Sequence, residues 1–236
     1  MEAQRKAAGE RAAAFVQDGM VIGYGTGRGA SAALEALAAR KARVRGVPTS
    51  QKTIELCRRL GLAIVSFDDH PQLDLVIDGA DEVDPQAQLL KGGGGAHVRE
   101  KLVALASRRR IIVVEEAKLV ARLGSTRGVP IEVVAFGWTG TLARIAALLP
   151  GAARREGPLS DNGGVLVDAP LPPGADLRAT DRALKGIAGV VDHGLFLDFA
   201  PTVVVGGAGG VRHGSAVWRA DASSACRING VSNGRF

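Results

Sequence analysis

Residues 73–101 read LDLVIDGADEVDPQAQLLKGGGGAHVREK, and this stretch indicates both the fold of the chain and the place of its chemistry. Its apolar beginning, LDLVI, has the length and composition of a buried strand, and Asp78 follows at the carboxyl end. In open α/β sheets, ligands bind just beyond the carboxyl ends of the strands. We therefore expect Asp78 and Asp81 to lie at a ligand site. Glu82 and Asp84 better fit a role in capping a helix or shaping a turn.

Four consecutive glycines, residues 92–95, are the second informative feature of this stretch. Glycine loses more conformational freedom on folding than any other residue, so such a run is costly unless the backbone must come very close to something. Lys91 precedes the run, and a helix is predicted from Ala96. Because helix N-termini carry unpaired N–H groups and partial positive charge, the ligand expected here is an anion.

The helix that is predicted from Ala96 indicates where Glu100 points. Its expected apolar stripe comprises Val98, Leu102, Leu105 and Ala106. At ~100° per residue, Glu100 lies roughly opposite that stripe, so it is either a solvated glutamate or a residue that faces a cleft. His97, in the first helical turn, is better explained as a structural histidine.

The composition is that of a soluble globular protein and restricts its partners. Of 236 residues, 46% are hydrophobic and 23% are charged, and no apolar run approaches the roughly 18 residues of a membrane span. The N-terminus lacks the apolar core of a signal peptide, so we expect a cytoplasmic protein with no membrane partner. The net charge of +6 is interleaved with acidic residues, which argues against nucleic-acid binding and suits a small anionic substrate. Cys57 and Cys226 are the only cysteines, too few for a disulfide framework or a metal site.

Short apolar runs alternate with helical patterns, which is typical of a parallel sheet built from βαβ units. The expected strands are residues 20–25, 43–48, 62–67, 73–78 and 110–115. The tight basic cluster Arg108 to Arg110 is expected in a solvated loop before the last of them.

Near Val129 the pattern changes to strands separated by two helical patches. We predict an α/β fold, with a Rossmann-like parallel-sheet domain and a smaller α+β (ferredoxin-like) lid domain. The expected limits are 1–128 for the Rossmann-like catalytic domain, 129–201 for the lid, 202–212 for a final strand that returns to the main domain, and 213–236 for a tail without ordered structure.

A glycine-rich turn, GYGTGRGAS at residues 23–31, connects a strand to a helix and could wrap a phosphate with its backbone N–H groups. Its spacing is not that of a dinucleotide fingerprint, so a tight turn without a ligand is an equal alternative.

Taken in order, eight segments resemble the A-type ribose-5-phosphate isomerase family over about residues 2–212. They are GYGTG (23–27), PTSQKT (48–53), DGADEVD (78–84), KGGGGAHVREK (91–101), EAKLVARLG (116–124), VPIEVVAFG (129–137), SDNGGVLVD (160–168) and VVDHGLFL (190–197). Any one could arise by chance, but all eight occur in the order of the family.

The resemblance implies an enzyme without cofactor or metal that interconverts D-ribose 5-phosphate and D-ribulose 5-phosphate in the non-oxidative branch of the pentose phosphate pathway. It implies a sugar phosphate as the small-molecule partner. It also implies a homodimer or homotetramer, since family members usually form one of these.

The resemblance also assigns residues to roles. Glu100 matches the family's proton acceptor, and Lys118 matches a further substrate contact. The three substrate loops match Thr26, Gly27, Arg28 and Gly29; Asp78, Gly79, Ala80 and Asp81; and Lys91, Gly92, Gly93 and Gly94.

The residue types suit that chemistry. A single carboxylate, Glu100, can remove a proton from C2 and return it to C1 through a cis-enediolate, and Lys91 can stabilise the negative charge of this intermediate. Asp81 is our candidate for opening the sugar ring, with Asp78 holding hydroxyls and orienting its neighbour. Because a working base should titrate near the operating pH, we expect burial or a nearby carboxylate to raise the pKa of Glu100.

The first loop departs from the family, since Arg28 and Gly29 stand where a serine and a threonine are common. We hypothesise that Arg28 takes over anion binding, with Ser31 contributing; the alternatives are weaker phosphate affinity or a different substrate. Near the N-terminus, either Arg5 or Lys6 stands where the family has a functional lysine.

Three rival interpretations stay open. Sugar-phosphate deaminases and CoA transferases have related α/β architectures, and fold alone does not choose between the reactions. A sugar-phosphate-sensing regulatory domain is a non-enzymatic alternative, although the residues before the first strand are too few for a DNA-binding helix-turn-helix. A catalytically dead relative is the third, given the altered first loop.

Overall fold

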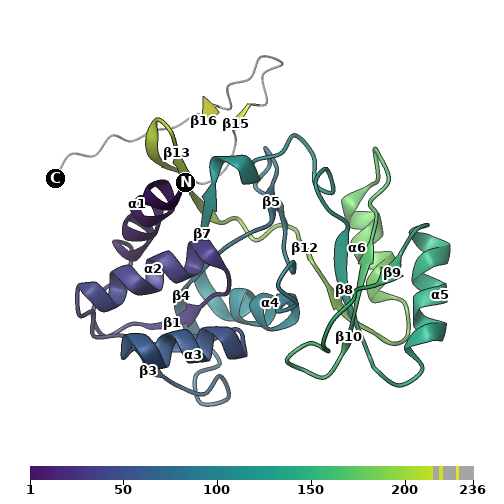
Figure 1. Cartoon of the computed structure of the whole chain (residues 1–236), viewed down its shortest axis with the longest axis horizontal. Helices are drawn as coiled ribbons and strands as arrows, with labels where there is room; N and C mark the ends of the chain where they lie inside the picture. Colours follow the sequence, from purple (N-terminus) through teal and green to yellow (C-terminus); the bar gives the residue numbers. More distant parts are fainter. Residues whose placement is uncertain (215–217, 220–226, 229–236) are drawn as a thin grey trace.

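The computed structural model describes residues 1–214, 218–219 and 227–228. Its main feature is a seven-stranded sheet in which neighbouring strands are parallel, except for one antiparallel pair, β13 and β14, at one edge. In spatial order the strands are β14 (Gly210–Gly214), β13 (Thr202–Gly207), β7 (Ser107–Glu115), β4 (Leu73–Asp78), β1 (Val21–Tyr24), β2 (Arg45–Pro48) and β3 (Ala63–Ile64). The predicted α/β class is therefore confirmed (Figure 1).

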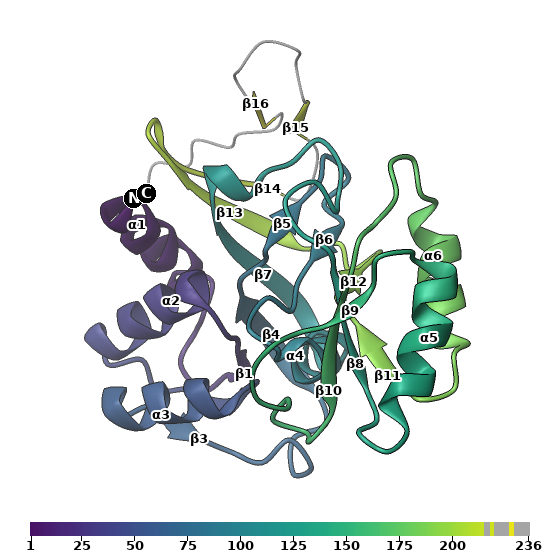
Figure 2. The same cartoon turned by 45° about the vertical axis from the view of Figure 1, so that its right-hand side comes forward.

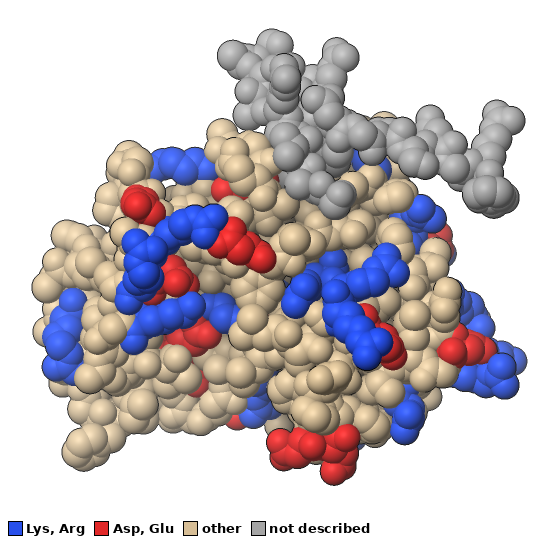
Figure 3. Space-filling model, turned by 180° about the vertical axis from the view of Figure 1, so that it is seen from behind, with Lys and Arg blue, Asp and Glu red and all other residues tan. Residues whose placement is uncertain are grey.

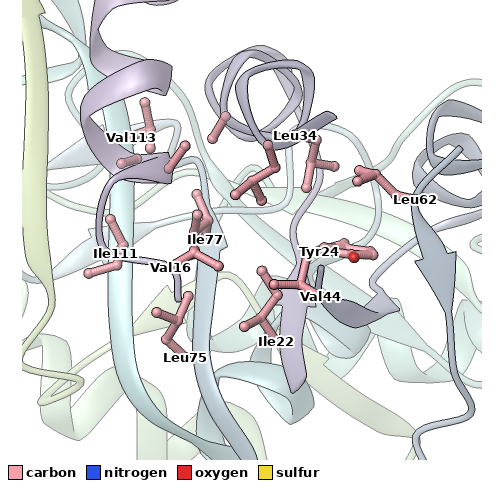
Figure 4. Close-up of a cluster of buried hydrophobic side chains, with 14 of the residues drawn as sticks. Val16, Ile22, Tyr24, Leu34, Val44, Leu62, Leu75, Ile77, Ile111 and Val113 are labelled. Carbon is pink, nitrogen blue, oxygen red and sulfur yellow. The ribbon is translucent and has the colours of Figure 1, made fainter. Parts of the chain in front are cut away.

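Helices cover both faces of this sheet. They are α1 (Glu2–Ala13), α2 (Arg28–Ala39), α3 (Gln51–Leu60) and α4 (His97–Ala106). Side chains alternate along β7: Ile111 and Val113 belong to the core shared with α1 and α2, whereas Ile112 and Val114 pack with residues of α4. Figure 4 shows the first of these cores, in which labelled side chains of β1, β4 and β7 gather together.

A second, four-stranded sheet is antiparallel throughout, with the order β11-β8-β10-β9. Its elements are β8 (Val129–Val133), α5 (Trp138–Leu148), β9 (Ala153–Arg154), β10 (Val165–Ala169), α6 (Leu177–Lys185) and β11 (Val190–His193). This βαββαβ order is that of a ferredoxin-like unit, as predicted. Figure 2 shows the unit standing beside the large sheet, with α5 and α6 on its outer side.

The chain passes from one unit to the other at two places. The small sheet begins at Val129, and the chain rejoins the large sheet at Thr202. The division of the chain into domains at 128/129 and at 201/202 stays a prediction.

The structure also contains a short three-stranded sheet, which the sequence did not predict. It consists of β5 (Glu82–Val83), β6 (Leu89–Leu90) and β12 (Leu195–Phe196), in the order β12-β6-β5. Asp84 shapes a turn as expected, since its carboxylate accepts from the backbone N–H groups of Gln86 and Gln88. Glu82 differs: it is fully buried and accepts from the backbone N–H groups of Gly124 and Thr126.

The apolar stripe predicted for α4 was wrong at its two leucines, although Val98 is buried as expected. Leu102 and Leu105 are 51% and 62% exposed, whereas Val103 and Ala104 are buried. The reason is that α4 turns its polar residues inward: Glu100 and Lys101 are buried because partners from other elements satisfy them. Glu100 is therefore the residue that faces a cleft, and the solvated alternative is excluded.

Three further expectations differ from the structure. Residues 108–110 lie within β7, which begins directly after α4, and the strand expected at 62–67 is reduced to β3. The single final strand expected at 202–212 is instead the hairpin β13/β14, which includes the first two residues of the predicted tail. The prediction for the rest of the tail falls outside the described residues, apart from two short paired strands, β15 (Trp218–Arg219) and β16 (Arg227–Ile228).

Positively and negatively charged side chains are interspersed on the face shown in Figure 3. Figure 3 shows Lys and Arg side chains next to Asp and Glu side chains on that face, with no separate basic region. Among the described residues, no helix has the length and apolar character that crossing a membrane requires.

Candidate active site

A pocket of about 230 Å³ opens beyond the carboxyl ends of β1, β4 and β7. Of the residues predicted to act on substrate, those that line it are Thr26, Gly27, Arg28, Gly29, Gly79, Ala80, Asp81, Lys91, Gly92, Gly93, Gly94, Glu100 and Lys118. Asp78 lies beneath the wall, almost completely buried. The structure thus brings together segments that are far apart in the sequence, at the edge of the sheet where α/β proteins bind ligands.

The ammonium group of Lys91 lies at the centre of the pocket floor, a name we use for Asp78, Lys91 and Glu100. Its Nζ is 3.0 Å from Oδ2 of Asp78 and 3.2 Å from Oε1 of Glu100, and it donates to the carbonyl oxygen of Gly79. Burial by itself lowers the pKa of Lys91, but the two carboxylates outweigh it and raise the pKa above its ordinary value. Lys91 therefore stays charged in a site from which water is largely excluded.

Glu100 projects from the first turns of α4 and is only 5% exposed. Burial raises the pKa of this carboxyl well above its ordinary value, the negative charge of Asp78 raises it further, and Lys91 opposes both. The direction matches the expectation from the sequence. A carboxyl of this kind can hold or release a proton near neutral pH.

Asp78 connects two loops beneath the pocket. Its Oδ1 accepts from the backbone N–H of Thr26 at 3.0 Å and from that of Gly79 at 2.8 Å. With Oδ1 fixed in this way, Oδ2 is directed at Lys91. Asp78 therefore orients the ammonium group and holds the loop after β1 against the loop after β4.

Asp81 stands at the wall of the pocket, with a side chain that is 21% exposed. Its Oδ2 accepts from the backbone N–H of Gly93 at 2.7 Å, and its Oδ1 lies 2.8 Å from Nη1 of Arg127. Sequence reasoning missed Arg127, because a single arginine in a loop of small polar residues carries no signal of a site. Gly92 has a φ of 104°, a conformation that side-chain-bearing residues rarely adopt, so part of the glycine run is required by the backbone itself.

The loop after β1 presents the N-terminus of α2 to the pocket. The helix begins at Arg28, after Gly27 as its N-cap residue. The hydroxyl of Thr26 is held in a cluster with those of Thr49, Ser50 and Thr53, at 2.7, 2.8 and 3.0 Å. The first N–H groups of α2 are thus available to an anion, whereas the Thr26 hydroxyl already has protein partners.

Three cations surround the mouth of the pocket, and we call Arg5, Arg28 and Lys118 the pocket rim. Arg5 is paired with Glu115, its Nε 2.6 Å from Oε1. The exposed side chain of Arg28 makes no hydrogen bond or ion pair within residues 1–214. Lys6 and Ser31 line a neighbouring hollow and not this pocket, so Arg5 is the member of the Arg5/Lys6 pair that reaches the site.

In the described part of the chain, no group of three or more His, Cys, Asp or Glu side chains is arranged to hold a metal ion. The acid and amine groups of the pocket floor bind one another instead.

Comparisons with known proteins place this chain in a family. Residues 45–210 match the family model described as ribose 5-phosphate isomerase A (phosphoriboisomerase A). The ribose-5-phosphate isomerase A of Caulobacter sp. (strain K31) is 48% identical over 212 residues, which covers 86% of this chain and 93% of that protein. This chain belongs to the ribose 5-phosphate isomerase A family.

Two solved structures of ribose-5-phosphate isomerases have the same fold. The enzyme of Methanocaldococcus jannaschii is 31% identical, with a TM-score of 0.86 over 91% of this chain and 99% of its own. A D-ribose-5-phosphate isomerase in complex with phospho-erythronic acid is 34% identical, with a TM-score of 0.86 over 91% of this chain and 98% of its own. The resemblance noted from eight short segments is therefore confirmed over most of the chain.

Proposed function

We propose that this protein interconverts D-ribose 5-phosphate and D-ribulose 5-phosphate, as an enzyme of the non-oxidative pentose phosphate pathway. The observation that carries the proposal is the pocket floor, where a buried glutamate and a buried lysine lie 3.2 Å apart in a chain of this family. The isomerase chemistry needs one base and one cation next to each other, and the floor supplies both.

Glu100 is the base of the proposed reaction. In its ionised form it takes the proton from C2 of the open-chain aldose, the electron pair forms the C1–C2 double bond, and the carbonyl oxygen on C1 gains the negative charge. Glu100 then returns the proton to C1, the hydroxyl proton on the C2 oxygen passes to the oxygen on C1, and the oxygen on C2 becomes the new carbonyl. Its raised pKa makes the carboxylate a stronger base than an exposed glutamate and its acid form a usable donor at neutral pH.

Lys91 stabilises the enediolate in this scheme. Its charge persists because Asp78 and Glu100 raise its pKa, and its position at the buried floor strengthens its interaction with a developing oxyanion. Asp78 keeps the ammonium group directed at the pocket, so we assign it an orienting role.

Asp81 assists ring opening in the proposed mechanism. Its carboxylate is the one acid of the predicted substrate loops that combines a position in the pocket wall with partial exposure. Gly93 and Arg127 hold it in place from two sides, which leaves lone pairs that can accept the proton of the anomeric hydroxyl as the bond between C1 and the ring oxygen breaks. Asp81 then passes this proton to the released ring oxygen.

The phosphate end of the substrate is assigned to the rim. The N-terminus of α2 offers backbone N–H groups, and Arg28 offers a guanidinium that has no partner within residues 1–214. Gly79, Ala80 and residues 92–94 would contact the sugar between this end and the floor.

The ligand of one solved relative has the two charged ends that this proposal requires of a substrate analogue. Phospho-erythronic acid, bound in that relative, carries a phosphate at one end and a carboxylate at the other. A planar carboxylate resembles an enediolate in shape and charge, so we expect the same acid to bind here more tightly than the substrate.

The deciding experiment measures ketose formation from ribose 5-phosphate with EDTA present, for the unmodified protein and for Glu100→Gln. Turnover that survives chelation, together with a loss of about 10²–10⁴-fold in the variant, is the expected result. Equal activity of both proteins would remove Glu100 from the role of base. Inactivity of both would favour the sensor, the dead relative or a different substrate.

We also propose that the protein forms a homodimer or homotetramer. Phe136 is 94% exposed and Val134 is 47% exposed, both next to β8 of the small unit, which is a costly arrangement for a monomer. Light scattering coupled to gel filtration tests this directly: a molar mass of two or four chains is expected, and Phe136→Ser should shift it toward one.

A further inference from the structure

The chain leaves the small sheet through the segment Asp192–Phe196. This segment contacts Lys91, which is paired with Glu100, and Lys101, which follows Glu100 in the sequence. The backbone N–H of Lys91 donates to the carbonyl oxygen of Gly194 at 2.9 Å. The ring centre of Phe196 lies 5.6 Å from Nζ of Lys91 and 5.0 Å from Nζ of Lys101. A single segment of the small unit therefore borders the pocket floor and the residue that follows the proposed base.

The contact with Lys91 is close enough to exclude any side chain at Gly194. A Cβ on that residue would lie 2.0 Å from the carbonyl oxygen of Lys91. Beside it, Leu195 pairs with Leu90 in the short β12–β6 ladder. The segment is thus packed against strand β6 and against Lys91, which directly follows that strand.

Lys101 is 4% exposed and reaches the same segment with its charged end. Its Nζ lies 2.6 Å from Oδ1 of Asp192 and 2.6 Å from the carbonyl oxygen of His193. It does not line the active-site pocket, so it cannot contact the substrate there. Since burying an ammonium group costs several kcal/mol unless it is paired, the Asp192 carboxylate is what makes this position possible.

A second contact joins the same face of α4 to the same residue. Nε2 of His97 lies 3.3 Å from the carbonyl oxygen of Asp192. His97 and Lys101 are four residues apart and therefore lie on one face of the helix, while Glu100 points about 100° away from Lys101. Two contacts on one face fix the rotation of α4 about its axis, and that rotation determines how far Glu100 lies from Lys91.

We propose that Lys101 and Asp192 form a positioning pair for the catalytic base, through which the small unit holds Glu100 at its working distance from Lys91. The inference rests on the proposed role of Glu100. Because a displacement of about 1 Å at a reacting group can cost about 10²-fold in rate, loss of the pair should lower kcat far more than it changes KM.

The experiment compares kcat, KM for ribose 5-phosphate and the melting temperature of Lys101→Met and Asp192→Asn. Both should lose about 10–100-fold in kcat with KM nearly unchanged, at temperatures well below their melting. Asp192→Glu, which keeps a carboxylate, should recover part of the loss. The matched control is Asp198→Asn, which removes another ion pair of the small unit, with Arg178, and should leave kcat unchanged.

A double-mutant cycle with Glu100→Gln separates this inference from the proposed function. If Lys101 acts through Glu100, adding Lys101→Met to Glu100→Gln should cause little further loss. An equal loss in both backgrounds, or folded single variants with normal kcat, would overturn the positioning role. Full activity of Glu100→Gln alone would instead overturn the role of Glu100. If Lys101→Met does not fold, Asp192→Asn in the same cycle decides.

Discussion

The floor and the rim of the pocket differ in how deeply their charged side chains are buried and in how these side chains are paired. The floor groups Asp78, Lys91 and Glu100 are at most 5% exposed, and each is within hydrogen-bonding or ion-pair distance of another. The rim groups are partly or largely in contact with water, and Arg28 has no partner within residues 1–214. Buried, mutually paired charges are fixed before substrate arrives, which suits the stabilisation of a transition state. Exposed cations are screened by salt and suit capture of an anion. We therefore propose that turnover depends on the floor and affinity on the rim.

Lys91→Met is the strongest test of this division. We expect kcat to fall by about 10²–10³-fold, because the enediolate loses its cation. The free energy of unfolding should also fall by about 3–5 kcal/mol, since Asp78 and Glu100 lose their buried counter-charge. Steady-state kinetics and urea unfolding measure the two effects. A variant that kept its kcat would break the assignment of turnover to the floor.

The pH dependence of stability tests the state of the floor without substrate. Burial raises the pKa of Glu100 in the folded protein, so the folded state binds this proton more tightly than the unfolded state does. The contribution of Glu100 to stability is therefore greatest below its unfolded pKa, and it is lost as the pH rises through the raised, folded one. The variant Glu100→Gln has no titrating group at this position. Its free energy of unfolding should therefore increase, relative to that of the unmodified protein, between about pH 5 and about pH 8. Denaturant unfolding at these two pH values measures the change, and a constant difference would contradict it.

Arg28→Ser tests the rim. The expected result is a rise of about 10-fold in KM with kcat nearly unchanged, because a hydrogen bond to a charged group is lost at the phosphate end. The KM of the unmodified protein should also rise with ionic strength, and more steeply than that of the variant. Lys6→Ser is the control, since Lys6 lies in the neighbouring hollow. An unchanged KM would show that α2 binds the phosphate by its backbone alone.

Lys118→Met should give the smallest effect. Its side chain is half-buried at the end of the short 3-10 turn η1 (Glu116–Lys118), at the edge of the pocket. We expect KM to rise by about 2–5-fold, which corresponds to the value of an exposed charge pair. A large fall in kcat would instead show that Lys118 contributes to turnover, as we propose for the floor residues, and would contradict its assignment to affinity.

The positions of two floor residues could be predicted from the sequence because local sequence patterns mark them. Asp78 follows an apolar run, and Lys91 precedes four glycines, so both positions could be read without any tertiary information. The rotation of α4 could not be read, since its buried face is polar and its leucines are exposed, which reverses the usual hydrophobic pattern. The strands β5, β6 and β12 have two residues each, too short for a period to show. Arg127 meets Asp81 only through tertiary folding, and nothing near it in the sequence marks it.

The pairing of β7 with β13 has a consequence for the order in which the protein is made. Ile111 pairs with Thr202, so about 90 residues must leave the ribosome before the large sheet can gain its sixth strand. At about 5–20 residues per second, β7 waits for several seconds as an open edge. For most of this interval the loops after β1 and β4 already exist, but Gly194, whose carbonyl oxygen accepts from the backbone N–H of Lys91, has not been synthesised. The nascent chain therefore completes its pocket floor late in translation, and until then the unpaired edge of β7 is the place where a chaperone or a wrong partner would attach.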